Sequence, residues 1–416
     1  MSYTKRVKNC RKHSPDIHGY CGPASMMTCL EGLGMNVSEV RQTDFYELAR
    51  GESGEAQKYW HSAPDLLVEA MNKRWPGMPA QVEYVLAVTE NPRELDLAMA
   101  AGIELLNAPS IALVQGGGHW ISVVGYCAEN EVTSPQDTDG RVIAMESINC
   151  GKPLKNEEAP DHVPEPIIHL AKDRCGKSGQ EPMLSYTPLM DWESQDGWMS
   201  RVTVGEKWTG HRVAIVPKAT GAHLQARVPK TVRGDRPVGR LAGGESRSIS
   251  LPGEVIPPEV ARDCVRRTVE YSKLHLRPPW ANHLGKGDAR AIPQPGEPVL
   301  VHHVDDPRKS YYIVPLLGSR VAATVNAING RVLEFGLFPT IPNYKPWCPE
   351  AAARAIQRAT ASGKFPIKNL HPGEIHPGLV WKRRRQAYTK FAPLLAFRHE
   401  DALWGLNRSG MVRELI

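Results

Sequence analysis

The chain of 416 residues has no long run of apolar residues. No stretch approaches the roughly 18 residues that a membrane-spanning helix needs, which excludes such a helix. The first ten residues are basic and lack the apolar core of a secretory signal peptide. We therefore expect a cytoplasmic protein without a membrane partner.

The eight cysteines do not have the spacing of a disulfide framework. They are scattered over positions 10, 21, 29, 127, 150, 175, 264 and 348. Glycine and proline are frequent, at 36 and 35 residues, but show no short period, which excludes collagen. The net charge of +6 is mild, so nucleic acid is not an expected partner.

Apolar residues make up 41% of the chain and charged residues 23%, which is typical of a globular protein. The length predicts two or three domains. Apolar periodicity in the first half predicts an alternation of helices and strands. The expected helices are the segment from Cys21 to Leu33, Val37–Leu48, Ala63–Met71 and Pro92–Leu106, and the expected strands are Ser110–Val114, Trp120–Tyr126, Val142–Met145 and His211–Val216.

The second half contains an internal repeat after a stretch rich in Gly, Pro, Arg and Ser. Pro258–Arg267 aligns with Pro349–Arg358, and Pro315–Arg320 aligns with Pro393–Arg398. Each copy is interpreted as a helix followed by a strand meander, with a two-residue hairpin at Asn329-Gly330. The predicted domains are an N-terminal domain (1–217), a linker (218–257), repeat 1 (258–340) and repeat 2 (341–416).

The repeats weakly resemble PepSY or cystatin-like modules, on a core that runs Tyr311-Tyr-Ile-Val-Pro315 and then Asn326-Ala-Ile-Asn-Gly-Arg-Val332. The plainer interpretation is a duplicated structural domain. The C-terminal repeats are expected either to recognise a substrate or partner, or to cover the first domain as an inhibitory module. The cystatin likeness implies the second role, which needs an intramolecular contact of the repeats with the first domain.

A thiol stands at the expected start of a helix, in Gly19-Tyr-Cys-Gly-Pro-Ala-Ser25. The partial positive charge and free N–H groups of a helix N-terminus stabilise the reactive thiolate. The Cys21 N–H is also suited to hold a developing oxyanion. The plain alternative is a buried cysteine at a helix end.

A histidine follows a glycine turn and opens a strand, in Gly118-His-Trp-Ile-Ser-Val-Val-Gly125. A thiolate nucleophile needs an imidazole within hydrogen-bond reach, and a rigid strand end is a suitable mount. His119 is therefore the candidate base for Cys21. Trp120, the next residue, either shields a substrate-binding cleft from water or fills the core. Gly22 is a second candidate for lining that cleft.

These two motifs resemble papain-like cysteine peptidases, nearest to the branch that processes double-glycine leaders of bacteriocins. The carrying residues are Cys21-Gly-Pro-Ala-Ser-Met-Met-Thr-Cys-Leu-Glu-Gly-Leu-Gly34 and His119-Trp-Ile-Ser-Val-Val-Gly-Tyr126. The resemblance covers residues 10–217. It implies a papain-like fold and a bacterial thiol protease with Cys21 as nucleophile and His119 as base.

The family's third catalytic residue is an Asp or Asn after the histidine strand, which orients the imidazole. Asn149 stands in the matching place, and the plain alternative is a turn residue before Gly151. Glu146 is a second candidate, followed by Asp137 and Asp139.

The chain departs from the family at the oxyanion donor. Relatives carry a glutamine about six residues before the cysteine, where this chain has Pro15. Ser14 and His18 are the substitute candidates, followed by His13. The missing donor favours a catalytically decayed scaffold as an alternative to an enzyme.

A competing interpretation joins Cys10, His13, His18 and Cys21 as zinc ligands. Such a site would use up Cys21 and leave the His119 strand unexplained, so we expect no metal and no cofactor. Two further segments are weaker candidates: a double-glycine sequence ending at Gly244 for self-processing, and Lys382–Arg385 as a solvated basic face.

The sequence thus predicts an α+β protein: a papain-like N-terminal domain, with a helical lobe and an antiparallel sheet, followed by a duplicated helix-plus-antiparallel-sheet unit. The predicted function is cleavage of a peptide or isopeptide bond in a peptide or protein substrate through a Cys-His-Asn site. An amidase or acyltransferase using the same residues is an open alternative.

Overall fold

The computed structural model divides the chain into two compact units, each described here by itself. The first holds Met1–Ser178 and Pro182–Arg233, and the second holds Gly179–Glu181 and Gly234–Ile416. The structure describes residues 3–16, 19–50, 62–73, 75, 82–137, 140–151, 182–194, 197–203, 207–225, 255–284, 292–342, 354, 356–358, 378–381, 389–399, 402–406 and 412–414.

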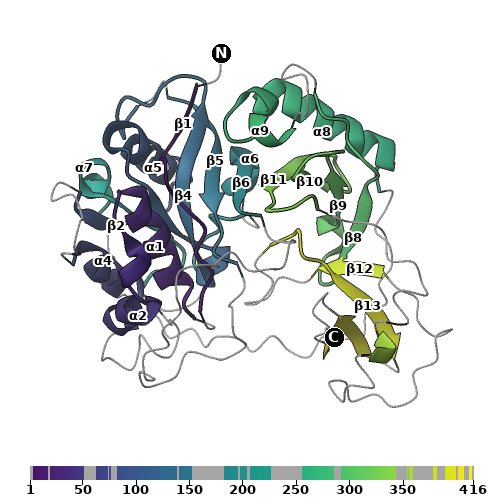
Figure 1. The fold of residues 1–416 in the computed structure, drawn as a ribbon, viewed down its shortest axis with the longest axis horizontal. Coiled ribbons are helices and arrows are strands. Elements are labelled where there is room, and N and C mark those ends of the chain that lie inside the picture. The colour runs from purple at the N-terminus through teal and green to yellow at the C-terminus, as the bar shows by residue number, and fades with distance from the viewer. Residues whose placement is uncertain are drawn as a thin grey trace. The chain divides into compact units, whose positions relative to one another are not determined.

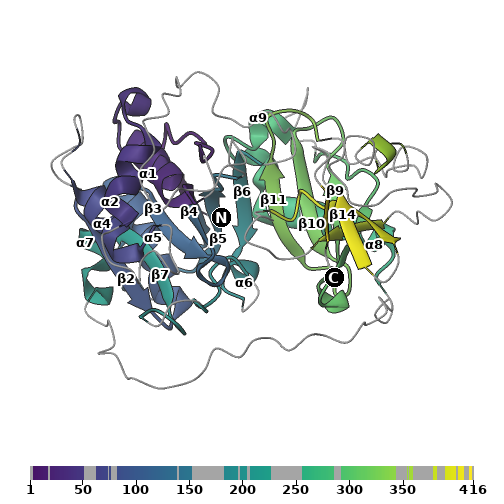
Figure 2. The ribbon, with the colours of Figure 1, turned by 90° about the horizontal axis from the view of Figure 1, so that it is seen from below.

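The N-terminal unit is built on a mostly antiparallel sheet of strand order β6-β5-β4-β3-β7-β2, with β1 pairing along the far half of β4. Its central strands lie side by side in Figure 2. The strands are β1 (Tyr3–Arg6), β2 (Tyr84–Thr89), β3 (Ser110–Val114), β4 (His119–Ala128), β5 (Val142–Ile148), β6 (Leu184–Pro188) and β7 (Arg212–Pro217).

Helices cover both faces of this sheet. One face packs against α1, α2 and α4, while α5 and α7 contact the other face (Figure 1). The helices are α1 (Cys21–Gly32), η1 (Val37–Glu39), α2 (Gln42–Arg50), α4 (Pro64–Asn72), α5 (Pro92–Leu106), η2 (Gln115–Gly117), α6 (Leu189–Trp192), α7 (Lys218–Gly221) and η4 (Ala222–Leu224).

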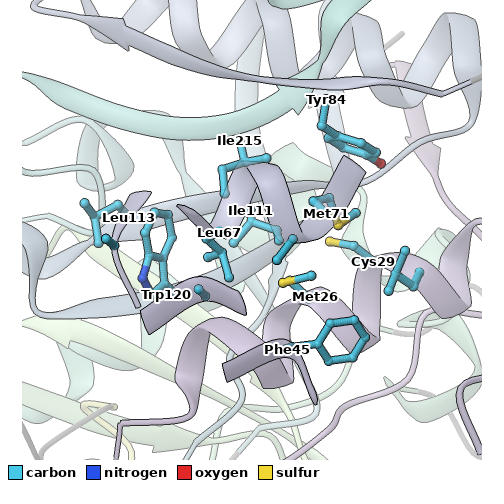
Figure 3. Packing of buried hydrophobic residues seen from close by; sticks show 14 of the residues in the cluster. Met26, Cys29, Phe45, Leu67, Met71, Tyr84, Ile111, Leu113, Trp120 and Ile215 are labelled. Atoms are coloured by element: carbon cyan, nitrogen blue, oxygen red, sulfur yellow. The ribbon is translucent and has the colours of Figure 1, made fainter. Parts of the chain in front are cut away.

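The core of the unit lies between α1, α2, α4 and the sheet (Figure 3). Met26 and Cys29 of α1 meet Ile111 of β3 and Trp120 of β4 in one cluster of buried side chains. Because strand side chains alternate between faces, every second residue of β3 joins this cluster. The packing fixes α1, which begins with Cys21, against β3 and against β4, which begins with His119.

Most predicted elements of this unit are present, with α5 and β3 at the predicted bounds. The single helix predicted over Val37–Leu48 is wrong in its first part, which forms η1 and is separated from α2 by an extended Val40. Asn36 starts η1 by accepting the Ser38 N–H. The predicted linker over 218–257 begins with α7 and η4, and residues 226–254 lie outside the described part.

The C-terminal unit has a sheet of strand order β15-β14-β13-β12-β8-β9-β10-β11. All its pairings are antiparallel except that between β12 and β8. Helix α8 packs against β9, β10 and β11 (Figure 1). The bounds are α8 (Pro258–Ser272), η5 (Leu274–Leu276), α9 (Ala281–Leu284), β8 (Val299–His303), η6 (Pro307–Lys309), β9 (Tyr311–Pro315), β10 (Val321–Asn326), β11 (Val332–Leu337), β12 (Gly378–Trp381), β13 (Leu394–His399), β14 (Ala402–Leu406) and β15 (Val412–Glu414).

The two halves of this sheet are meanders, β8 to β11 and β12 to β15, which is the layout expected of a repeat. One aligned pair of segments is not equivalent in the structure. Pro315–Arg320 is the end of β9 and the following turn, whereas Pro393–Arg398 lies largely within β13. The alignment of these two segments, which rests on their shared Pro-Leu-Leu sequence, is therefore wrong.

The predicted two-residue hairpin at Asn329-Gly330 is also a longer turn. Asn326 N–H bonds the carbonyl of Arg331, and only Gly330 has a positive φ, of 72°. The Asn326 side chain accepts the N–H groups of Ile328 and Asn329 and so stabilises the wider loop. Across the described ranges of both units, no helix is long and apolar enough to cross a membrane.

Candidate active site

Cys21 is the first residue of α1, with a partly exposed side chain. The chain enters the helix through Tyr20, whose carbonyl accepts the N–H of Ala24 at 2.9 Å. No side chain caps this helix end. The N–H groups of Cys21 and Gly22, the first two of α1, are thus available to the sulfur. Pro23, the next residue, has no N–H.

Three backbone amides surround the Cys21 sulfur. The N–H groups of Cys21, Gly22 and Trp120 hydrogen-bond to it and lower its pKa. Burial has the larger effect and raises the pKa of the Cys21 thiol above its usual value. The pKa of the Cys21 thiol is therefore raised, whereas the helix N-terminus alone would lower it. The surroundings favour the neutral thiol as the resting form.

A left-handed turn delivers His119 to the start of β4. Gln115, Gly116 and Gly117 have φ values of 57°, 70° and 93°. The turn is held from outside by the segment around Thr203, whose N–H donates to the Gly116 carbonyl at 2.9 Å. Glycine is required at Gly116, since a Cβ there would lie 3.0 Å from Thr203 Oγ1.

His119 and Asn149 meet at the end of the sheet. The Nε2 atom of His119 lies 2.9 Å from Oδ1 of Asn149, and both side chains are buried. The same oxygen accepts the N–H of Gly151 at 2.9 Å. With Oδ1 as acceptor, the proton on Nε2 is donated to Asn149, which leaves the lone pair of the imidazole on Nδ1.

Helix α1 is tied to β4 at the residue after His119. The Ser25 hydroxyl donates to the Trp120 carbonyl at 3.2 Å, and the Ser122 hydroxyl donates to the Ser25 carbonyl at 3.1 Å. Together with the bond from Trp120 N–H to the Cys21 sulfur, these contacts bring the start of α1 to the start of β4. The two sequence motifs therefore meet in space.

The other candidates for orienting His119 lie elsewhere. Glu146 pairs with Gly125 of β4, and a Cβ on Gly125 would lie 2.7 Å from its carboxylate. Gly125 is about 20 Å along the strand from His119, at roughly 3.3 Å per residue. Asp137 accepts the N–H groups of Thr133 and Gly140 in a loop. Asp139 lies outside the described residues.

The predicted oxyanion donors have mixed outcomes. Ser14 is buried, and its carbonyl accepts a 2.8 Å bond from Gln42, which also accepts the Asp16 N–H at 2.9 Å. Gln42 thus clamps the loop that holds Pro15. His13 contacts Glu31 at 3.0 Å, and His18 lies outside the described residues. The donors seen at the sulfur are the backbone amides.

The two cleft candidates have structural roles. The Trp120 indole is buried in the core cluster and donates to the Ser62 carbonyl at 3.2 Å (Figure 3). Gly22 lets Ser62 approach α1, since a Cβ at position 22 would lie 2.8 Å from the Cβ of Ser62. Trp120 reaches Cys21 through its backbone rather than through its ring.

Sequence reasoning missed Cys150, which lies directly after Asn149. Its buried sulfur is 3.7 Å from Nε2 of His119 and 3.7 Å from the Trp120 carbonyl. Its adjacency to Asn149 was the only signal in the sequence. None of the six cysteines that the structure describes forms a disulfide.

The zinc interpretation finds no support among the described residues, where no three His, Cys, Asp or Glu side chains are grouped to hold a metal ion. His18, one of its four proposed ligands, lies outside that part. Cys10 is buried and close to Gly32 of α1, where a Cβ would collide with its sulfur. The chain around Cys10 is therefore packed against the helix.

No family model, curated protein or solved structure matches the chain. The papain-like resemblance is carried by the residues of the two motifs.

Proposed function

We propose that the chain is a cysteine hydrolase that cleaves a peptide or isopeptide bond, with Cys21 as nucleophile, His119 as base and Asn149 as the residue that orients the imidazole. The observation that carries this proposal is the 2.9 Å contact of His119 Nε2 with Asn149, next to Trp120, whose N–H bonds the Cys21 sulfur. A Cys-His-Asn grouping with a buried His-Asn pair is the arrangement of thiol nucleophilic catalysis.

In the proposed reaction, the Cys21 sulfur attacks the carbonyl carbon of the substrate while Nδ1 of His119 takes the thiol proton. Because the Cys21 surroundings favour the neutral thiol, proton transfer accompanies the attack instead of preceding it. His119 then gives the proton to the leaving amine, which produces a thioester on Cys21. Water attacks the thioester with His119 again as base, which releases the acid.

The amides of Cys21 and Gly22 are the proposed oxyanion donors. Both already direct their N–H groups to the sulfur, beside which the carbonyl oxygen of a substrate has to sit. The family's glutamine is replaced by Pro15, so one side-chain donor is missing. The loss of one such donor costs about 3–4 kcal/mol of transition-state stabilisation, which predicts slow turnover.

The second candidate function is a binding scaffold on a catalytically decayed site. Two observations favour it: Pro15 at the position of the oxyanion donor, and the raised pKa of the Cys21 thiol, caused by burial. The C-terminal unit then supplies the contacts to a peptide or protein partner. An amidase or acyltransferase would use the same three residues with a different acceptor.

The test is hydrolysis of a peptide library by the full chain, read by mass spectrometry of the products. The enzyme proposal expects cleavage that is lost in Cys21→Ala and His119→Ala and is reduced in Asn149→Ala. Thr28→Ser on α1, which keeps the hydroxyl that bonds the Arg11 carbonyl, is the control variant and is expected to keep activity. No cleavage, with folding intact, would favour the scaffold.

A further inference from the structure

Cys150 is a buried thiol that the proposed hydrolysis does not use. It is 1% exposed, and its sulfur lies within 3.7 Å of the His119 ring. This is the ring that the proposed function assigns to Cys21 as base. Cys150 is therefore the second thiol of the site and not a plain core residue.

The sulfurs of Cys21 and Cys150 both bond to the backbone of Trp120. The Trp120 N–H bonds the sulfur of Cys21, and the Trp120 carbonyl accepts from the sulfur of Cys150 at 3.7 Å. The N–H and C=O groups of one strand residue point to the same edge of the strand. The two sulfurs consequently lie along one edge of β4.

β5 does not continue along that edge at Trp120. β5 pairs with β4 only as far as Ser122, opposite Ile148, and the chain then leaves the ladder through Asn149 and Cys150. The first turn of α1 occupies the edge instead. The Ser25 hydroxyl donates to the same Trp120 carbonyl at 3.2 Å. Among the strands that the structure describes, none pairs with β4 at Trp120 along this edge.

We propose that Cys21 and Cys150 form a reversible disulfide when the protein is exposed to hydrogen peroxide. This proposal rests on the same residues as the proposed function but does not require turnover. The disulfide takes away the nucleophile while it lasts. It also protects Cys21 from further oxidation, since a disulfide can be reduced and a sulfinic acid cannot be reduced by thiols.

The reaction has two steps. The Cys21 sulfur, which is the more exposed of the two, attacks peroxide, so that an S–O bond forms, the O–O bond breaks and hydroxide leaves. The Cys150 sulfur then attacks the sulfenic acid, so that the S–S bond forms and the S–O bond breaks with loss of a second hydroxide. The two thiol protons convert both hydroxides to water, and the two electrons lost by the sulfurs reduce the peroxide. A dithiol reverses the change.

The test treats the full chain with hydrogen peroxide, blocks remaining thiols under denaturing conditions and maps the peptides without reduction. We expect a linked peptide pair containing Cys21 and Cys150, lighter by two hydrogen atoms, and full recovery of Cys21 labelling after dithiothreitol. In Cys150→Ala, we expect Cys21 to advance to the sulfinic acid and to lose its labelling permanently. Cys127→Ala, a buried cysteine further along β4, is the matched control and should behave as the parent.

The proposal is overturned if Cys21 of the parent stays unoxidised, or becomes sulfinic acid as fast as in Cys150→Ala, with no linked peptide. The parent map decides the question even if Cys150→Ala fails to fold. Peptide cleavage is measured separately, so a linked pair without hydrolysis rejects only the proposed function. Hydrolysis without a linked pair rejects only the disulfide.

Discussion

The Nε2 atom of His119 lies 2.9 Å from the Oδ1 atom of Asn149, although 30 positions separate the two residues in the chain. The contact forms because β4 and β5 are neighbours and the chain leaves β5 at the end where β4 begins. It fixes which ring nitrogen faces Asn149, and so assigns Nδ1 to the proposed proton transfer with Cys21.

Removing the Asn149 amide tests its positioning role. We expect Asn149→Ala to lower kcat/KM for peptide cleavage by about 10- to 100-fold, because a hydrogen bond to a group that becomes charged is worth about 1.5–3 kcal/mol. The loss should lie in kcat, with KM little changed. Asn36→Ala, which removes an exposed amide bonded to Ser38, is the control and should keep full activity. Equal kinetics of parent and Asn149→Ala would rule the role out.

The glycine turn before His119 gives a sharp pair of variants. Gly116→Ala places a side chain on a residue with φ of 70°, at a cost of about 1–2 kcal/mol. Gly118→Ala needs no such strain, because its φ is −84° and its Cβ would meet only the Gln115 carbonyl, at 3.4 Å. We expect Gly116→Ala alone to lower the melting temperature and slow the reaction of Cys21. The same melting temperature for both variants contradicts the strain argument.

Glu104 ties the first strand to the rest of the N-terminal unit. Its carboxylate accepts the hydroxyls of Tyr3 and Tyr126 and the ammonium of Lys5. We expect Glu104→Ala to cost about 2–3 kcal/mol, since it leaves several polar groups without their acceptor. Hydrogen exchange of the Tyr3–Arg6 amides should accelerate more than that of the other strands.

The control for Glu104 is Glu129→Ala, which removes an exposed ion pair with Arg141 worth about 0–1 kcal/mol. Unchanged protection of β1 in Glu104→Ala would show that the backbone pairing with β4 holds the strand without the carboxylate.

Cys10 should resist alkylation until the pH is very high. Burial raises the pKa of the Cys10 thiol to about 12, so the folded chain keeps it neutral at a pH where an unfolded chain ionises it. Since the folded pKa is raised, this thiol favours folding below about pH 9 and favours it less as the pH rises toward 12. Mass spectrometry after iodoacetamide at pH 9 should find Cys10 unlabelled, and labelled after denaturation. Rapid labelling of the folded chain would contradict the burial.

The sequence predicted the elements whose limits are set locally. α5 begins at Pro92, after the capping Asn91, and ends at Leu106, before Asn107 in the left-handed conformation, so its bounds are visible in the residues themselves. β1 was missed because it is a short strand of mostly polar residues that exists through pairing with β4. β2 was missed although its residues are mostly apolar, and its pairing with β7 is a tertiary contact that the local sequence does not show.

In the candidate site, too, some features are visible in the local sequence and others depend on tertiary packing. Cys21 and His119 stand in recognisable local motifs, and Asn149 follows from its place after the next strand. The contact of Cys150 with His119 and the clamp of Gln42 on the loop at Ser14 arise from tertiary packing, which no local pattern encodes. The raised pKa of Cys21 is also a property of the folded chain, since burial outweighs the backbone amides of Trp120, Gly22 and Cys21 that lower it.

The most direct measurement of the central claim is the rate of reaction of Cys21 with iodoacetamide at pH 7 in the full chain and in His119→Ala. If the imidazole takes the proton of the Cys21 thiol, the parent reacts rapidly and the variant reacts more slowly than a free cysteine, because burial then acts unopposed by a base. Equal rates in the two proteins would contradict the claim.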